Sequence, residues 1–166
     1  RVYSEDGSTR PFKAVIATPD GGDNTVAIYN VGQIEFPLAA HVIANVVDEP
    51  MSDFGATSMI VQGGALRTYS FDASVESVEI MLKTDGRPLN ARIEMLQGPN
   101  NNKQVIELYT EDGLERPFFA IIDTLGSGNV VRVVNTAPME FPMTASVQPH
   151  SINEMVSPTD PVIGNR

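Results

Sequence analysis

Paired acidic residues are the first feature of this sequence that could do chemistry. Glu5-Asp6 and Glu111-Asp112 each place two carboxyl groups side by side, and such pairs can share a proton or bind calcium. Each pair directly precedes a glycine, Gly7 or Gly113. An acidic residue before glycine is typical of a tight turn, so we predict that both pairs form turns rather than a catalytic or calcium site.

The other candidates for chemistry are also isolated. The two histidines, His41 and His150, have no neighbour at the spacing of a metal or catalytic partner, and we interpret both as ordinary structural residues. Ser70 and Ser74 lack the glycine-flanked sequence of a serine nucleophile. The sequence therefore predicts no catalytic residue, no cofactor site and no metal site.

One glycine-rich loop has a calcium-like composition. It runs from Asp20 to Asn24 and includes Asp23. The matching loop later in the chain, Gly126 to Asn129, has no acidic residue. This difference between the two loops weakens the case for calcium, and no phosphate-binding glycine motif is present either.

Composition excludes several classes of protein. The chain has 166 residues, a formal net charge of −10 and no cysteine. The negative charge and the scattered basic residues disfavour nucleic-acid binding, and the absence of cysteine excludes disulfides and thiolate metal sites. The longest apolar runs, such as residues 118–122, are far shorter than the ~18 residues of a membrane-spanning helix. We expect a folded protein with no membrane span.

An internal repeat is the most informative feature of the sequence. Residues 2–42 align with residues 108–147, at an offset of 106 that becomes 105 after Asp23, and 19 of 40 aligned pairs are identical. Val2 to Gly7 returns as Leu108 to Gly113, and Glu35-Phe36-Pro37 returns as Glu140-Phe141-Pro142. We interpret this similarity as the duplication of a folding unit.

The two repeats differ in what precedes them. Residues 69–105, a stretch of strand-like segments, lead into the second repeat, whereas the first repeat begins at the first residue of the sequence. Two explanations stay open. A preceding segment is missing from this sequence, or the first repeat is a half-unit whose missing strands come from elsewhere.

Period-two alternation of apolar residues predicts strands and no helix. It is clearest in residues 75–83, where Val78, Ile80 and Leu82 share one face, and Asp85-Gly86 then predicts a hairpin. Further strands are expected at residues 12–18, 25–31, 38–47, 91–95, 105–110, 118–124, 129–135 and 143–147.

The predicted fold class is all-β. It comprises two pseudo-symmetric antiparallel sheet or sandwich units that arise from the duplication. We predict a first repeat at residues 1–47, a linker at 48–58, a second repeat with its lead-in strands at 59–147, and an extended C-terminal tail at 148–166.

Eight residues that match between the repeats are candidates for structural or interface roles. Arg10 and Glu35, with their counterparts Arg116 and Glu140, are the opposite charges kept in both copies. We favour an arginine–carboxylate pair within each repeat over a ligand contact. The accompanying aromatic residues, predicted to be core anchors, are Phe12, Phe36, Phe118 and Phe141.

The chain resembles the repeated domain of the diatom pyrenoid-shell (PyShell) proteins. The resemblance lies in the run from Ala91 through Gly98-Pro99-Asn100 to Val105, in Glu111-Asp112-Gly113 and Arg116-Pro117-Phe118, and in residues 128–136 and 139–142. It covers residues 75–147 directly and residues 2–42 through the repeat. It implies a non-enzymatic protein without cofactors that self-associates into a sheet around the Rubisco condensate, at the pyrenoid periphery in the chloroplast stroma.

The resemblance implies that the main partner is another copy of the chain, with the Rubisco matrix or other shell proteins as further candidates. Residues 148–166, which are rich in proline, are predicted to dock on an adjacent subunit. The alternative hypothesis is a β-sandwich binding module for a protein or carbohydrate partner. An enzyme would need a site built from Asp, Glu, Arg and Tyr alone, and no spacing in the sequence indicates one.

Overall fold

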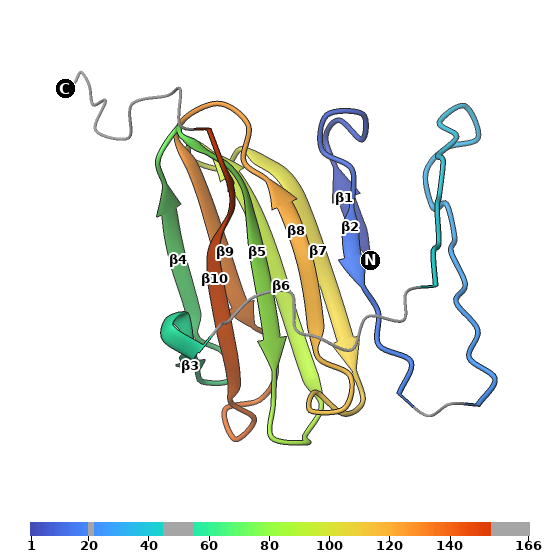
Figure 1. The fold of residues 1–166 in the computed structure, drawn as a ribbon, viewed down its shortest axis with the longest axis vertical. Coiled ribbons are helices and arrows are strands. Elements are labelled where there is room, and N and C mark those ends of the chain that lie inside the picture. The colour runs from blue at the N-terminus through green and yellow to red at the C-terminus, as the bar shows by residue number, and fades with distance from the viewer. Residues whose placement is uncertain (20–21, 45–54, 154–166) are drawn as a thin grey trace.

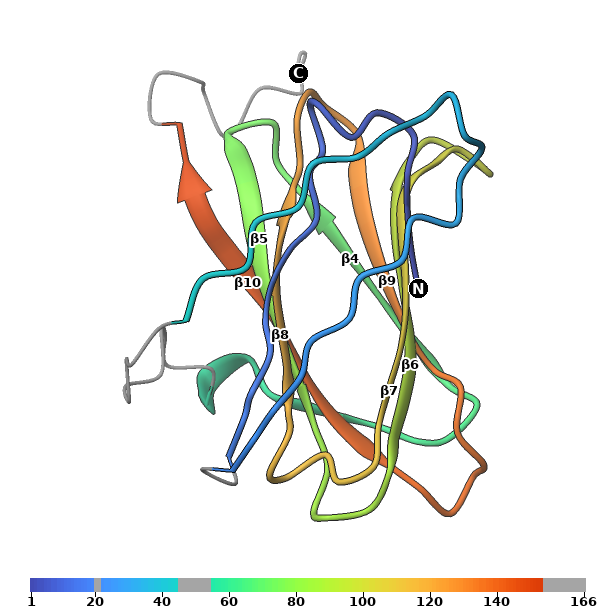
Figure 2. The ribbon, with the colours of Figure 1, turned by 90° about the vertical axis from the view of Figure 1, so that its right-hand side faces the viewer.

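Two antiparallel five-stranded sheets form the described part of the protein. The computed structural model describes residues 1–19, 22–44 and 55–153. One sheet has the order β1-β7-β6-β9-β4 and the other the order β2-β8-β5-β10-β3. Figure 2 shows these sheets as two facing layers, with β5, β8 and β10 in one layer and β6, β7 and β9 in the other. The all-β prediction is confirmed.

The strands of the first sheet are β1 (Val2–Ser4), β4 (Leu66–Phe71), β6 (Leu89–Gln97), β7 (Asn102–Thr110) and β9 (Asn129–Asn135). Those of the second sheet are β2 (Lys13–Val15), β3 (Met59–Val61), β5 (Val75–Lys83), β8 (Phe118–Asp123) and β10 (Met143–Ile152). Within the described ranges, the single helical element is η1, a short 3-10 helix at Gly55–Thr57.

The hairpin β5–β6 is the centre of the sandwich. Its strand β5 lies between β8 and β10, and β6 lies between β7 and β9. Gly86 in the connecting turn has a φ of 118°, a conformation that glycine adopts without steric cost. Each strand of the hairpin therefore has a hydrogen-bonded neighbour on both sides.

Alternating residues of the two sheets build the core. In β6 and β9 every second residue is buried, as the period of a strand requires when one face meets the opposite sheet. Fully buried side chains include Ile80 of β5, Ile93 of β6 and Val133 of β9. The core thus lies between the sheets and depends on the central hairpin.

The first repeat extends both sheets at the same side. Strand β1 pairs with β7 and β2 pairs with β8. Figure 1 shows residues 22–44 as extended chain beyond β1 and β2, on the side away from the core of the sandwich. The first repeat therefore continues the sandwich past the edge of the second.

Two strands predicted in the first repeat are absent. Residues 25–31 and 38–44 are extended but belong to no sheet, whereas their counterparts in the second repeat form β9 and β10. The physical reason is that a strand needs a neighbour for its backbone groups, and no described strand lies beside these segments. Residues 45–47 of the second predicted strand lie outside the described residues.

The remaining boundaries differ from the predicted ones at the C-terminal end. Strand β10 continues to Ile152 because Gln148–Ile152 pair with residues 75–79 of β5. This part of the predicted tail is therefore a strand. Residues 154–166 of that tail, residues 48–54 of the predicted linker and Asp20-Gly21 of the glycine-rich loop lie outside the described residues.

Candidate functional site

The acidic pairs form the same turn in both repeats. Asp6 Oδ1 accepts hydrogen bonds from the backbone N–H groups of Ser8 at 2.9 Å and Thr9 at 3.2 Å. Asp112 Oδ1 accepts the equivalent bonds from Leu114 at 2.8 Å and Glu115 at 3.1 Å. The Thr9 and Ser8 bonds lower the pKa of Asp6 below its usual value. The prediction of turns is confirmed.

Arg10 and Arg116 lie at the junction of the two repeats. Arg10, which is buried, donates from Nη1 to the carbonyl oxygen of Asp123 at 3.0 Å. Arg116 donates from Nη1 to the carbonyl oxygen of Ala17 at 3.4 Å. Asp123 and Ala17 are counterparts at the offset of 106. The arginine of each repeat therefore donates a hydrogen bond to the matching backbone carbonyl of the other repeat.

The strand pairing at the junction has the same reciprocal form. Ala14 of β2 pairs with its own counterpart, Ala120 of β8. In the other sheet, the Arg1 terminal amine donates to the Glu107 carbonyl at 2.7 Å and the Glu107 N–H donates to the Arg1 carbonyl at 2.8 Å. Arg1 and Glu107 are also counterparts. The contacts between the repeats therefore have the pattern of a local twofold axis.

Two ion pairs and one buried amide add to the junction. Lys13 Nζ lies 3.1 Å from Asp123 Oδ1, and Lys103 Nζ lies 2.8 Å from Glu5 Oε1. The buried Gln104 side chain donates to Ser4 Oγ at 2.8 Å and to the Arg10 carbonyl at 3.2 Å. These contacts tie β1, β2 and their turn to the edge of the second repeat.

The expected pairing of these arginines with glutamates is wrong. Glu35 and Glu140 lie exposed in turns, and neither carboxylate is in an ion pair with another described residue. The arginines instead bind backbone carbonyls across the junction, because β2 and β8 pair directly and bring those carbonyls within reach.

The four phenylalanine candidates differ in burial between the two repeats. Phe118 packs against the core, and Phe141 is half-buried. Phe12 and Phe36 of the first repeat are exposed by 43% and 62%. The prediction of core anchors therefore describes the second repeat better than the first.

The tip of the central hairpin docks on the second repeat through Arg87. Its Nη1 donates to the carbonyl oxygen of Glu140 at 2.7 Å, and its guanidinium lies 5.9 Å from the centre of the Phe141 ring. Asp85 holds the guanidinium with two hydrogen bonds of 2.9 and 3.0 Å. This contact lowers the pKa of Asp85 and raises that of Arg87.

Backbone contacts hold the other parts of the hairpin. Gly113 donates its N–H to the Arg87 carbonyl at 3.0 Å and accepts from the Thr84 N–H at 3.2 Å. At the start of β5, Thr124 Oγ1 donates to the Val75 carbonyl at 2.7 Å. At the end of β6, Gln97 Nε2 donates to Asn129 Oδ1 at 3.1 Å.

The first repeat presents an open apolar face. Val26, Ile28, Leu38 and Val42 are exposed by 44%, 52%, 53% and 65%. Exposed apolar side chains that gather on one face usually mark an interaction site, and the counterparts of these four residues share one buried core. It is the clearest candidate for a functional surface in the described part of the chain.

Little else in the structure could support chemistry. His41 is exposed, and His150 Nδ1 lies 3.5 Å from Glu79 Oε1 on the neighbouring strand. The described residues contain no group of three or more His, Cys, Asp or Glu side chains that could hold a metal ion. None of the described helices is long and apolar enough to span a membrane.

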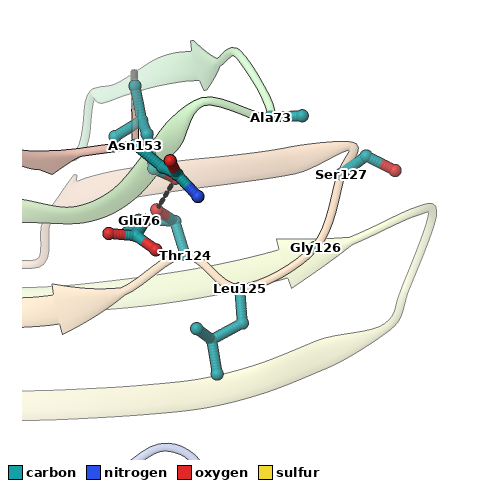
Figure 3. A pocket seen from close by; sticks show the side chains of 8 residues that line it. Ala73, Glu76, Thr124, Leu125, Gly126, Ser127 and Asn153 are labelled. Carbon is teal, nitrogen blue, oxygen red and sulfur yellow. Dashed lines mark hydrogen bonds between the residues drawn. The ribbon is translucent and has the colours of Figure 1, made fainter. Parts of the chain in front are cut away.

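One hollow of about 400 Å³ lies at the end of the sandwich, between residues 73–76 and the loop after β8. Figure 3 shows its lining, where Glu76, Ser127 and Asn153 supply the polar side chains and Leu125 an apolar one. The side chain of Thr124 is already bonded to the Val75 carbonyl. This lining offers a single carboxylate and no histidine, so it is not arranged as an acid–base or metal site.

The sequence interpretation missed several residues of the junction and of the hairpin contacts. Thr124, Gly113 and Asn129 hold the central hairpin, and each is identical in the first repeat, as Thr18, Gly7 and Asn24. Identity between repeats at uncharged positions is the signal that could have found them. The carbonyls of Asp123 and Ala17 carry no such signal, because any residue type supplies a backbone carbonyl.

Comparisons with known proteins identify a family. The family model described as "Diatom pyrenoid shell protein" matches residues 1–149. No curated protein matches the chain. A solved structure of the tripod (BppUct-A-L) from the baseplate of bacteriophage Tuc2009 is 15% identical over 81% of this chain and 84% of that one, with a TM-score of 0.24.

Proposed function

Because the chain belongs to the diatom pyrenoid shell proteins, we propose that it is a non-enzymatic subunit that self-assembles into a protein sheet. This sheet would enclose the Rubisco-containing pyrenoid at its periphery in the chloroplast stroma and thereby support CO2 fixation. The match of the family model to residues 1–149 is the observation that carries this proposal. Its main partner would be another copy of the chain, with the Rubisco matrix or other shell proteins as further partners.

The edges of the sandwich support self-association. Among the described strands, β3 pairs only with β10, and β4 pairs only with β9. Met59 and Ile60 on β3 and Leu66 on β4 are exposed by 43%, 62% and 50%. Exposed apolar edges with free backbone groups favour pairing with another chain. Residues 22–44 of the first repeat lie at the opposite side of the molecule (Figure 1).

Contacts between unlike surfaces at opposite sides of a subunit can extend an assembly from copy to copy. A contact between the β3–β4 edge of one copy and the first repeat of the next would be head-to-tail, and head-to-tail contacts that do not close into a ring form rows. Neighbouring rows would need lateral contacts as well. Docking of the rest of the predicted tail, residues 154–166, on an adjacent subunit is one source of such contacts.

Negative-stain electron microscopy of the purified chain, across a series of protein and salt concentrations, tests this proposal. We expect sheets or tubes without any added partner. Ile60→Lys should shorten or abolish them while the circular dichroism spectrum stays unchanged, because Ile60 is largely exposed on the edge. Met139→Lys is the matched control, since Met139 is 77% exposed in a turn.

Persistently monomeric particles at all concentrations would contradict self-assembly. That outcome would favour the alternative of a β-sandwich binding module. Equal loss of assemblies in the Ile60→Lys and Met139→Lys variants would show that the β3 edge has no special part in them.

A further inference from the structure

The first repeat has the parts of a β-sandwich without its central hairpin. We propose that it binds a second β-hairpin of the same kind as residues 75–97. One strand of that hairpin would lie between β1 and residues 24–31, and the other between β2 and residues 38–43. This inference rests on comparison of the two repeats and is independent of the proposed shell function.

The apolar residues of the first repeat are exposed where their counterparts are buried. Five positions show this difference. Val26, Ile28, Leu38, Val42 and Ile16 are exposed by 44%, 52%, 53%, 65% and 63%, whereas Val131, Val133, Met143, Val147 and Ile122 are exposed by 0%, 0%, 2%, 5% and 1%.

These five counterparts in the second repeat lie in the core cluster that the β5–β6 hairpin completes. Not every apolar residue of the first repeat differs in this way. Ile34 and its counterpart Met139 are exposed by 99% and 77%. The five pairs that differ between exposed and buried therefore lie on the face that a central hairpin would cover.

The polar contacts to the hairpin have identical counterparts in the first repeat. In the second repeat, five residues make these contacts: Gly113, Thr124, Asn129, Glu140 and Phe141. Their counterparts have the same residue types: Gly7, Thr18, Asn24, Glu35 and Phe36. The first repeat thus keeps the groups that would receive a second hairpin.

The space around Gly7 shows that the position of a second hairpin is open. A Cβ atom added at Gly113 would lie 2.5 Å from Thr84 Oγ1 of the hairpin, whereas a Cβ atom added at Gly7 would meet no atom within 4 Å. Phe36 is exposed by 62%, whereas Phe141 is covered by Arg87. The ring of Phe36 and the carbonyl of Glu35 are therefore free for an arginine at the tip of a second hairpin.

The turn at residues 30–36 of the first repeat has the same side-chain contacts as the matching turn of the second repeat. Asn30 Nδ2 donates to the Phe36 carbonyl and Asn30 Oδ1 accepts from the Gly32 N–H, both at 2.9 Å. Asn135 makes the same two contacts, with Phe141 at 2.9 Å and Ala137 at 3.0 Å. The turn between the two extended segments is thus the one that joins β9 to β10, although no described strand lies between those segments and β1 or β2.

The occupant is a second hairpin, additional to the one that the described residues contain. Each copy has one such hairpin among its described residues, and that hairpin fills the second repeat. Each copy has two repeats that can receive a hairpin. If copies exchanged their hairpins, one of every two repeats would still lack one. We infer a hairpin with the chemistry of residues 75–97: apolar residues alternating along both strands and an arginine just after its turn.

The test adds such a hairpin to the full chain. A copy of residues 75–106 is joined directly to Arg1, because Arg1 is the counterpart of Glu107 and this junction repeats the natural connection. Hydrogen–deuterium exchange is then measured for residues 24–30 and 38–43. We expect exchange to slow at least about tenfold, since paired strands are protected from local opening.

The matched control carries Ile80→Lys and Ile93→Lys in the added copy alone. Both isoleucines are fully buried in the native hairpin, so this copy should leave exchange of the first repeat unchanged. Unaltered exchange with the unmodified added copy would overturn the proposal. Protection in the chain without any addition, rising with protein concentration together with dimer formation, would also overturn it, because the chain's own hairpin would then be the occupant.

A binding measurement covers the case in which the fusion does not fold. A fluorescently labelled peptide of residues 75–97 is titrated with the unmodified full chain. We expect saturable binding that Ile28→Lys abolishes and Ile34→Lys leaves unchanged. Absence of binding, or equal loss in the two variants, would contradict the proposal.

Discussion

Gly7 and Gly113 occupy matching turns but differ in their surroundings. A Cβ atom at Gly113 would lie 2.5 Å from Oγ1 and 2.9 Å from Cγ2 of Thr84. Thr84 cannot easily move away, because its Oγ1 donates to the Arg87 carbonyl and accepts from the Gly86 N–H. Gly7 has open space instead. The two positions therefore form a natural matched pair for mutation.

We predict that Gly113→Ala lowers the free energy of unfolding by about 1–3 kcal/mol, as overpacking does. Gly7→Ala should change it by less than about 0.5 kcal/mol. Urea denaturation followed by circular dichroism measures both. Equal effects of the two substitutions would mean that the turns have the same neighbours, which would also argue against an open place in the first repeat.

Tyr69 has a hydroxyl group that is buried and has no hydrogen-bond partner. An unsatisfied buried hydroxyl opposes folding. Tyr69→Phe should therefore leave the free energy of unfolding unchanged or raise it by up to about 1 kcal/mol at pH 8. Loss of stability in this variant would show that the hydroxyl is bonded in solution.

Burial also raises the pKa of Tyr69 above 10.0 in the folded state. Below that pH both states hold the proton, so the contribution to stability is constant. As the pH rises further, the unfolded state ionises first, and folding loses this contribution. Denaturation at pH values from about 8 to 11 should show a steeper loss for the wild type than for Tyr69→Phe, and parallel curves would contradict the shift.

At the scale of elements, the predicted strands that formed are those with a hydrogen-bonded neighbouring strand. The strands at residues 75–83 and 129–135 could be predicted to the residue, because they alternate and lie between two neighbours. Residues 25–31 have nearly the same pattern but form no strand, since alternation specifies a face and does not supply a partner.

The roles of the paired residues were harder to predict. Identity between repeats located Arg10 and Arg116, but their acceptors are backbone carbonyls of the opposite repeat. A carbonyl has no signature in the sequence, and its position depends on the register of β2 with β8. The glutamates were matched to the arginines by charge, whereas Glu140 meets the hairpin through its backbone.

The junction of the repeats depends on Arg10. We predict that Arg10→Ala lowers the free energy of unfolding by about 1–3 kcal/mol, because it leaves the Asp123 carbonyl without this donor. Hydrogen exchange should become faster in β1 and β2 and stay unchanged in β5 and β9, because the first repeat can open locally. Arg67→Ala, at an exposed position on β4, is the control. Uniform acceleration across all strands would show that the repeats unfold as one unit.

At the scale of the whole molecule, net charge opposes assembly. Each chain has a formal charge of −10, so neighbouring copies repel one another at low ionic strength. Salt near ~0.15 M screens exposed charges beyond about 8 Å. We therefore predict that the threshold protein concentration for assembly decreases when the salt concentration is raised from about 0.01 to about 0.15 M. Light scattering measures this threshold, and electron microscopy checks the form of the assemblies.

A charge variant separates this general repulsion from specific contacts. Glu35→Gln with Glu140→Gln changes the formal charge from −10 to −8 at two exposed carboxylates that form no ion pair with a described residue. If repulsion limits assembly, this variant should assemble at lower salt than the wild type. If salt dissolves the assemblies instead, attractive ion pairs between copies must outweigh the repulsion. The exposed carboxylates of one copy would then have to contact lysine or arginine side chains of the next.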